Sequence, residues 1–212
     1  MFSSVFRPYG PVWNFLNHVT DVLGLSILWC FCCLPIVTIA PATTALYDAT
    51  VRGIRYGEEG PYRRFFHTFR REWKQGVGVS VLFGLLLVFG SWVLAMLDEL
   101  GQSDRTAALM AGGYRAVLLI PLAAACWAVT IQSRFSFSFR GLIVTAVRFL
   151  PAHLLSSAVL AVFTWLVFWF CNDTPIALTF APVVCTLAWS LVTEPVFRKY
   201  NAGVEPTGEE TA

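Results

Sequence analysis

Charged side chains are scarce in this chain. Of its 212 residues only 13% are Asp, Glu, Lys or Arg, and 57% are hydrophobic, whereas an ordinary soluble domain is about a quarter charged. The mean hydropathy of +0.65 agrees with this composition. The low charge excludes an ordinary soluble globular domain and predicts an integral membrane protein.

Five stretches contain no Asp, Glu, Lys or Arg at all, and each is 18 to 26 residues long. About 20 residues of helix cross a hydrocarbon core of roughly 30 Å, so each stretch is long enough to span a bilayer. A transmembrane β-barrel needs shorter strands with alternating polar and apolar residues, a pattern that these stretches lack. We therefore predict an all-α, polytopic membrane protein, a single helical domain over residues 1–200, with five transmembrane helices at about 22–40, 76–97, 114–133, 150–171 and 175–194.

Recognisable arrangements of catalytic or metal-binding residues are also missing from the sequence. The six cysteines lie inside the uncharged stretches, where a thiol behaves as a small hydrophobic group, and the three histidines are scattered. There is no Gly-x-Ser-x-Gly, no His-Glu-x-x-His, no phosphate-binding glycine loop and no pair of intramembrane carboxylates. We predict no metal site, no cofactor and no enzymatic activity.

A signal-peptidase site is suggested by Ala40, Pro41 and Ala42, which follow the apolar part of the first stretch. The residues before that stretch carry one fixed positive charge, Arg7, and the dense positive charge comes after it. These features favour a retained membrane anchor over a cleaved signal peptide.

Positive charge is distributed unevenly between the loops. Seven of the fifteen Lys and Arg residues lie between Arg52 and Lys74. Cytoplasmic loops carry an excess of Lys and Arg, so we place this segment in the cytoplasm, with the N-terminus outside and the C-terminus inside. Alternation of the spans then puts 12 of the 15 basic residues on the cytoplasmic side. Residues 201–212 are small, polar and acidic, and we predict that they form a disordered tail.

The cytoplasmic amphipathic region at 42–75 contains the clearest local pattern. Gly60 followed by Pro61 predicts a helix that starts at the proline, because proline is best tolerated at the first helical position. Aromatic residues recur along one side of this helix and basic residues along the other. Such a helix either anchors the chain in the lipid headgroups or docks a partner protein. The residues predicted to contact a partner or headgroups are Arg63, Arg64, Phe66, Phe69, Arg70, Arg71, Trp73 and Lys74.

Nucleic acid is not expected as a partner of this region. Basic residues that lie flush against a bilayer cannot follow a phosphate backbone freely.

Several short motifs follow one another between positions 34 and 75: LPIVTIAPATTALY at 34–47, RG at 52–53, GEEG at 57–60, FF at 65–66 and WKQ at 73–75. Together they resemble the signature region of the YesL-like integral membrane proteins, a bacterial family of unknown function. The FRKY sequence at 197–200 is similar to the ending of that family, whereas Ala40 stands where the family tends to have glycine. The resemblance implies a multi-pass protein of the bacterial cytoplasmic membrane. Genes of the family often accompany carbohydrate-uptake and glycan-breakdown genes, so it also implies a helper of an ATP-binding-cassette sugar importer.

Prolines and threonines cluster near the end of the first predicted span. Each proline removes a helix hydrogen bond, and threonine hydroxyls can bond the carbonyls that are freed. Pro35 is expected to kink the span and Pro41 to open a cytoplasmic helix, while a site for sugar hydroxyls is the alternative. This candidate polar site or helix break comprises Pro35, Thr38, Pro41, Thr43 and Thr44.

The interiors of the predicted spans contain almost no ionisable residues, which argues against ion-coupled transport. Glu194 lies near the end of the fifth span, at a spacing from Arg198 that suits a local helical pair. Gly76, Ser80 and Gly84 recur at four-residue spacing, a pattern that predicts close helix packing within the chain rather than a dimer seam.

These observations predict a non-catalytic membrane accessory protein that assists carbohydrate uptake. Its expected partners are the lipid bilayer and the membrane subunits of a sugar importer, and no particular oligomeric state is predicted. The alternative is a small transporter or channel for a neutral solute, in which the proline-broken first span lines the pathway.

Overall fold

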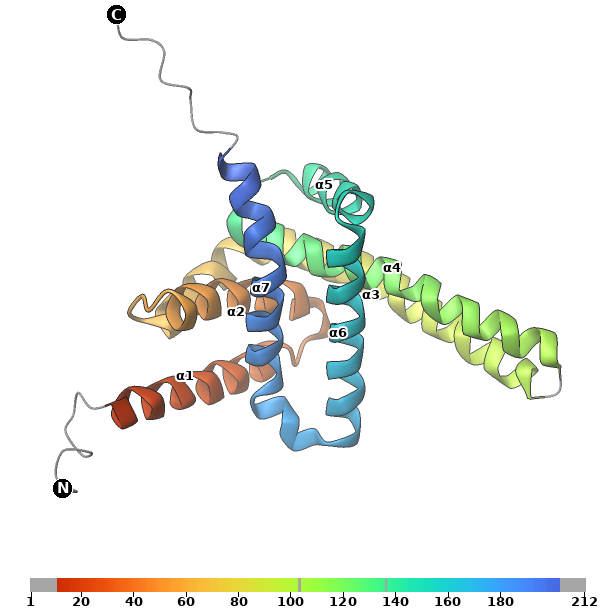
Figure 1. The fold of residues 1–212 in the computed structure, drawn as a ribbon, viewed down its shortest axis with the longest axis horizontal. Helices are drawn as coiled ribbons and strands as arrows, with labels where there is room; N and C mark the ends of the chain where they lie inside the picture. Colours follow the sequence, from red (N-terminus) through yellow and green to blue (C-terminus); the bar gives the residue numbers. More distant parts are fainter. Residues whose placement is uncertain (1–10, 103, 136, 203–212) are drawn as a thin grey trace, which may run out of the picture.

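Helices make up the secondary structure of the described chain. The computed structural model describes residues 11–102, 104–135 and 137–202, and within these ranges it contains helices and no strands, which confirms the all-α prediction. The α-helices are α1 (Pro11–Cys32), α2 (Ile39–Ala49), α3 (Pro61–Gly101), α4 (Arg105–Arg134), α5 (Phe139–Ala152), α6 (Leu154–Asp173) and α7 (Ala181–Ala202) (Figure 1). The 3-10 helices η1 (Ile36–Thr38) and η3 (Pro175–Thr179) and the π-helix η2 (Thr50–Arg55) connect them.

Three of these helices are long and apolar enough to cross a membrane, namely α3, α4 and α6. They correspond to the predicted spans 76–97, 114–133 and 150–171, although Leu150, Pro151 and Ala152 belong to α5. The predicted span 175–194 begins as η3 and continues as α7 beyond residue 194. The count of five spans therefore stays a prediction. The predicted tail at 201–212 starts inside α7 and lies outside the described residues from position 203 on.

The predicted helix at 22–40 is wrong as a single element, because α1 ends at Cys32 and the chain turns back. Pro35 lacks a backbone N–H and disfavours helix at the residue before it, so the helix stops there. α2 then returns antiparallel to α1 (Figure 1). Trp29 donates from Nε1 to Thr43 Oγ1 at 3.1 Å, and Leu25 packs with Ala49 further along the pair.

The hairpin of α1 and α2 places α2, which covers residues 42–49 of the predicted amphipathic region, inside the molecule. The cytoplasmic location of region 42–75 stays a prediction. Ala42, Ala45, Tyr47 and Ala49 are each 0% exposed. Small side chains let neighbouring helices approach closely on several sides. α2 is therefore the centre of the helical packing.

The helix α3 starts where the sequence predicted, at Pro61 behind Gly60, whose φ of 75° is left-handed and suits glycine. It then continues without interruption to Gly101. The amphipathic helix and the second span are thus one element of 41 residues, not two. Its first turns lie beside α1, since the Tyr62 hydroxyl donates to the Thr20 carbonyl at 3.3 Å.

The predicted small-residue contact forms between α3 and α2. Ser80 Oγ accepts a hydrogen bond from the Ala40 amide at 2.8 Å, and Gly76 lies against Pro41. A Cβ added at Gly76 would lie 2.7 Å from the Pro41 Cβ and 2.9 Å from its Cα. Gly84, by contrast, has nothing within 4 Å of such a Cβ. The small residues at 76 and 80 serve packing within the chain, as predicted.

We expect opposite effects from alanine at these two glycines. G76A forces α2 and α3 apart and should destabilise the protein by roughly 1–3 kcal/mol, the usual cost of overpacking. G84A meets open space and should stabilise α3 by up to about 1 kcal/mol through helix propensity. Thermal unfolding in a mild detergent, followed by tryptophan fluorescence, measures both. Equal effects of the two substitutions would contradict the close contact at Gly76.

Candidate functional site

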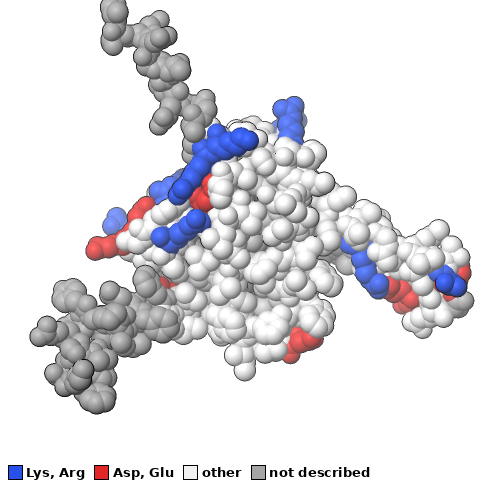
Figure 2. Space-filling model, in the orientation of Figure 1, with Lys and Arg blue, Asp and Glu red and all other residues white. Residues whose placement is uncertain are grey.

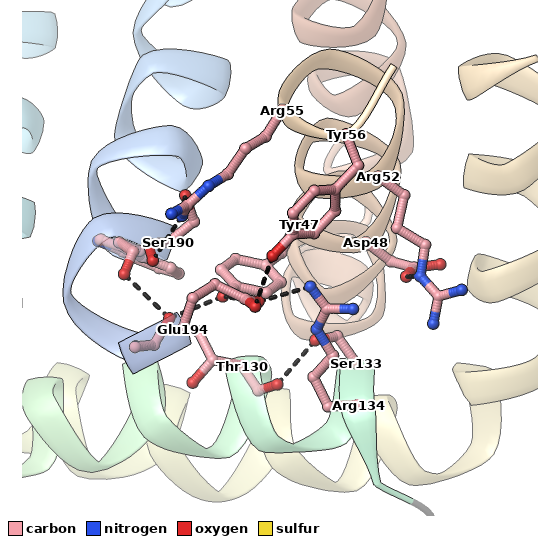
Figure 3. Close-up of polar contacts among 12 residues, drawn as sticks. Tyr47, Asp48, Arg52, Arg55, Tyr56, Thr130, Ser133, Arg134, Ser190 and Glu194 are labelled. Atoms are coloured by element: carbon pink, nitrogen blue, oxygen red, sulfur yellow. Dashed lines mark hydrogen bonds and ion pairs between the residues drawn. The ribbon is translucent and has the colours of Figure 1, made fainter. Parts of the chain in front are cut away.

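A polar cluster joins α2, η2, α4 and α7 around the carboxylate of Glu194 (Figure 3). Arg134 Nη2 at the end of α4 lies 2.5 Å from Glu194 Oε1. The Tyr56 hydroxyl donates to Oε2 at 3.1 Å, and the Tyr47 hydroxyl lies 3.4 Å from Oε1. The side chains of Arg134 and Glu194 are only 17% and 9% exposed. The carboxylate is therefore met by one cation and two hydroxyl groups.

The proton of Tyr47 is held by a second acceptor. The Thr193 hydroxyl donates its proton to the Trp189 carbonyl at 2.9 Å. The Thr193 Oγ1 atom, which lies 2.7 Å from the Tyr47 hydroxyl, therefore accepts the proton of Tyr47. Burial raises the pKa of the Tyr47 hydroxyl above its ordinary value. Tyr47 consequently remains a neutral hydrogen-bond donor at physiological pH.

The residue spacing on α7 and the wider turn of η2 bring the polar side chains of the cluster together. Thr186, Ser190 and Thr193 recur along one side of α7 and are buried, which gives this helix a polar inner stripe. Facing it, the wider turn of the π-helix η2 carries Arg55, whose Nη1 donates to the carbonyl and the hydroxyl of Ser190 at 2.9 and 2.8 Å. Such π-bulges frequently occur at functional sites.

The local pair expected between Glu194 and Arg198 is replaced by a long-range one. Glu194 pairs with Arg134, which is 60 positions away in sequence, while Arg198 is exposed. Helical spacing identified a possible neighbour on the same helix but carries no information about cations on other helices. The sequence offered one signal of this pair, the position of Glu194 directly after an uncharged stretch. A carboxylate that is buried there requires a cationic partner.

A second buried carboxylate, that of Asp48, connects α2 to the start of α3. Thr68 donates from Oγ1 to Asp48 Oδ2 at 2.7 Å, and Arg52 Nε lies 3.1 Å from Oδ1. Asp48 is 4% exposed. The two carboxylates are thus both neutralised by arginines, an arrangement that suits structural clasps between helices.

Among the described residues, no group of three or more His, Cys, Asp and Glu side chains is placed to hold a metal ion. Cys126 and Cys185 are buried, and all six cysteines are free thiols. In the polar cluster, Glu194 is paired with Arg134, and Arg55 is hydrogen-bonded to Ser190 rather than to a carboxylate. These contacts join α4, η2 and α7.

The predicted docking residues divide into an exposed and a covered group. Phe69 is half-buried, stacked on Phe65 with ring centroids 6.1 Å apart, and Arg64 pairs with Glu58. Phe65, which the prediction did not include, is fully buried against α2. The exposed members are Arg63, Phe66, Arg70, Arg71, Trp73 and Lys74.

The predicted polar residues near the helix break mostly bond to their own backbone. Thr38 lies 2.5 Å from the carbonyl oxygens of both Cys32 and Pro35, and Thr43 donates to the Ile39 carbonyl at 2.6 Å. Thr44 is fully buried, and its hydroxyl has no hydrogen-bond partner among the described residues. Pro35 lies in the turn and Pro41 in the first turn of α2. This geometry matches a helix break closed by threonine hydroxyls.

Residues 22–94 match the model of a family described as "Protein of unknown function, DUF624". The matched segment runs from α1 through most of α3, so it includes the α1–α2 hairpin and every predicted docking and polar residue. Comparison with curated proteins and with solved structures found no match.

We expect the Arg134–Glu194 pair to be essential for stability. E194A leaves the guanidinium of Arg134 and the hydroxyl of Tyr56 without their acceptor, and should cost roughly 3–5 kcal/mol. The matched control is D98A, which removes the exposed ion pair with Arg115 and should cost about 0–1 kcal/mol. Chemical unfolding in detergent measures both free energies. The double variant R134M/E194L should be more stable than E194A. A similar loss in E194A and D98A would show that the buried pair does not clasp the helices.

Proposed function

We propose that this chain is a non-catalytic accessory protein of the bacterial cytoplasmic membrane that binds membrane subunits of an ATP-binding-cassette sugar importer. Three helices of membrane-spanning length support the membrane location. The YesL-like signature between positions 34 and 75 supports the link to carbohydrate uptake. The binding surface is the outward side of the first turns of α3.

This docking face consists of Arg63, Phe66, Arg70, Trp73 and Lys74. Their spacing places them on one side of α3, opposite the buried Phe65 and Thr68. Phe66 is 54% exposed and Trp73 42% exposed, among cationic neighbours. Arginine and large aromatic residues are the types enriched at protein interfaces and at their binding hot spots.

The rigid seating of α3 is the observation that carries the proposal. Thr68 is hydrogen-bonded to Asp48, and Phe65 is buried in the core beside α1 and α2. The docking face is therefore held in one orientation before any partner arrives. Preorganisation of this kind reduces the entropic cost of binding, whereas a headgroup anchor needs only an amphipathic helix.

In the proposed membrane arrangement, α3, α4, α6 and α7 cross the bilayer, and the α1–α2 hairpin enters and leaves on the same side. α1 ends at Cys32 and α2 returns along it, which is the shape of a re-entrant segment that is buried in protein. Figure 2 shows Lys and Arg gathered around the end of α7 and the turn before α3, whereas the α6–α7 turn shows acidic side chains only in this view. The positive end faces the cytoplasm, and α1 reaches the start of α3 at this side through the contact of Thr20 with Tyr62.

The alternative function, a small transporter or channel for a neutral solute, has less support from the helix break. Its threonines Thr38 and Thr43 are engaged with backbone carbonyls and with Trp29. A sugar pathway needs hydroxyl groups and carbonyls that remain open to the solute.

Neutralising the docking face should abolish partner binding. We expect R63Q/R70Q/K74Q to lose co-purification of importer subunits, identified by mass spectrometry after affinity isolation, because the charge complementarity to an acidic partner surface is removed. F66A/W73A should weaken recovery by at least roughly tenfold, since truncating aromatic anchors typically costs ~2 kcal/mol.

The matched control is R140Q/R148Q, which removes exposed cations from α5 at the same end of the molecule. It should leave recovery unchanged. Equal losses in all three variants would indicate a general effect of charge or folding. Full recovery from the docking-face variants would rule out this surface.

Cysteine accessibility tests the membrane arrangement. Single cysteines replace Ser4, Glu59 and Gln102 in turn, and intact cells are treated with a membrane-impermeant maleimide. We expect labelling at position 102, and at positions 4 and 59 only after permeabilisation, because the hairpin returns to its starting side. Labelling at position 4 in intact cells would show instead that α1 crosses the membrane, with an exterior N-terminus as the charge pattern alone predicts.

A further inference from the structure

We propose that the cavity between the α1–α2 hairpin and the other helices binds one hydrocarbon chain of a bilayer lipid. The cavity has a volume of about 350 Å³, within the range of roughly 300–1,000 Å³ that is usual for small-molecule sites. Its wall includes Trp29 of α1, Ala40 of α2, Phe83 of α3, Ala125 of α4, Val167 of α6 and Trp189 of α7.

The polar groups in the wall are already hydrogen-bonded to one another. Trp29 Nε1 donates to Thr43, and Trp189 Nε1 donates to Thr164, each at 3.1 Å. Ser80 Oγ accepts from the backbone amide of Ala40 at 2.8 Å. A sugar in this cavity would leave its hydroxyl groups without partners, which costs free energy for each buried group. The wall therefore selects an apolar occupant.

The mouth of the cavity points to the bilayer as the source of that occupant. Ile36 and Phe168 line the cavity and are also 77% and 74% exposed at the molecular surface. In the membrane arrangement proposed above, on which this inference rests, these residues contact lipid tails. A linear acyl chain can enter between helices while its headgroup stays at the interface. An unfilled cavity would forfeit dispersion contacts along its whole wall.

Occupancy would stabilise the seating of the hairpin. Ile36, Ile39 and Ala40 at the turn form one side of the cavity, and residues of α3, α4, α6 and α7 form the rest. A bound chain contacts both sides at once. A ligand that binds only when the hairpin is packed against the other helices shifts the equilibrium toward that packed state.

Photo-crosslinking tests the proposal with two glycines as a matched pair. A Cβ at Gly84, which lines the cavity, meets nothing within 4 Å, and the same holds for the exposed Gly112 of α4, which does not line it. The full chain is reconstituted in phosphatidylethanolamine vesicles that contain phosphatidylethanolamine with a diazirine at the end of one acyl chain. After illumination, the crosslinked peptides are identified by mass spectrometry.

We expect crosslinks at the hairpin turn and at Trp189. In G84F, and in the second cavity-filling variant A125F, these crosslinks should fall by about tenfold, which corresponds to about 1.4 kcal/mol of binding free energy. G112F should match the wild type. Undiminished crosslinks in both filling variants, or crosslinks confined to outward residues such as Leu85 and Phe89, would overturn the site and show surface lipid only. Failure of the wild-type chain to co-float with vesicles would overturn the membrane location itself, and the cavity proposal with it.

Discussion

A carboxylate that is removed from water must be met by a cation and by hydrogen-bond donors, and Glu194 imposes this requirement on four segments of the chain. Arg134 supplies the cation from the end of α4, and Tyr47 and Tyr56 supply hydroxyl groups from α2 and just after η2. None of these groups is near Glu194 in sequence. The carboxylate therefore fixes the end of α4 and the later turns of α7 against the returning helix α2 of the hairpin. The polar stripe on α7 faces the same junction.

The small residues of α2 allow this junction to form. Ala42, Ala45 and Ala49 are fully buried, so α1, α3 and α7 can all approach the same short helix. On its other side, Gly76 of α3 leaves room for the ring of Pro41. α3 consequently has a packed side that is fixed by α2 and a side left free to bind, and the same helix serves both purposes.

The sequence predicted those features that depend on neighbouring residues. The helical class, the start of α3 at Pro61 and the contact of Gly76 and Ser80 all follow from local spacing or from conformational limits of single residues. The break at Pro35 was also expected, but the direction of the chain after it was not. A proline ends a helix without specifying whether the next helix continues or returns.

Other features depended on contacts that local patterns cannot contain. The Arg134–Glu194 pair spans 60 positions, and the burial of Phe65 between exposed Tyr62 and Phe66 depends on where α2 lies. The division of α3 into an interfacial helix and a span assumed a bend at the change from basic to apolar residues. Nothing in the residues around Gln75 breaks a helix, since glycine weakens a helix without ending it.

The continuity of α3 has a mechanical consequence. At 1.5 Å per residue its 41 residues form a rod of about 60 Å, which touches α2 near one third of its length, where Gly76 meets Pro41. Phe65, Thr68 and Ser80 also contact α2 or the core beside it, so the first half of the rod is fixed in place. The second half, paired with α4, projects beyond the other helices (Figure 1) and carries the turn into α4 far from the docking face.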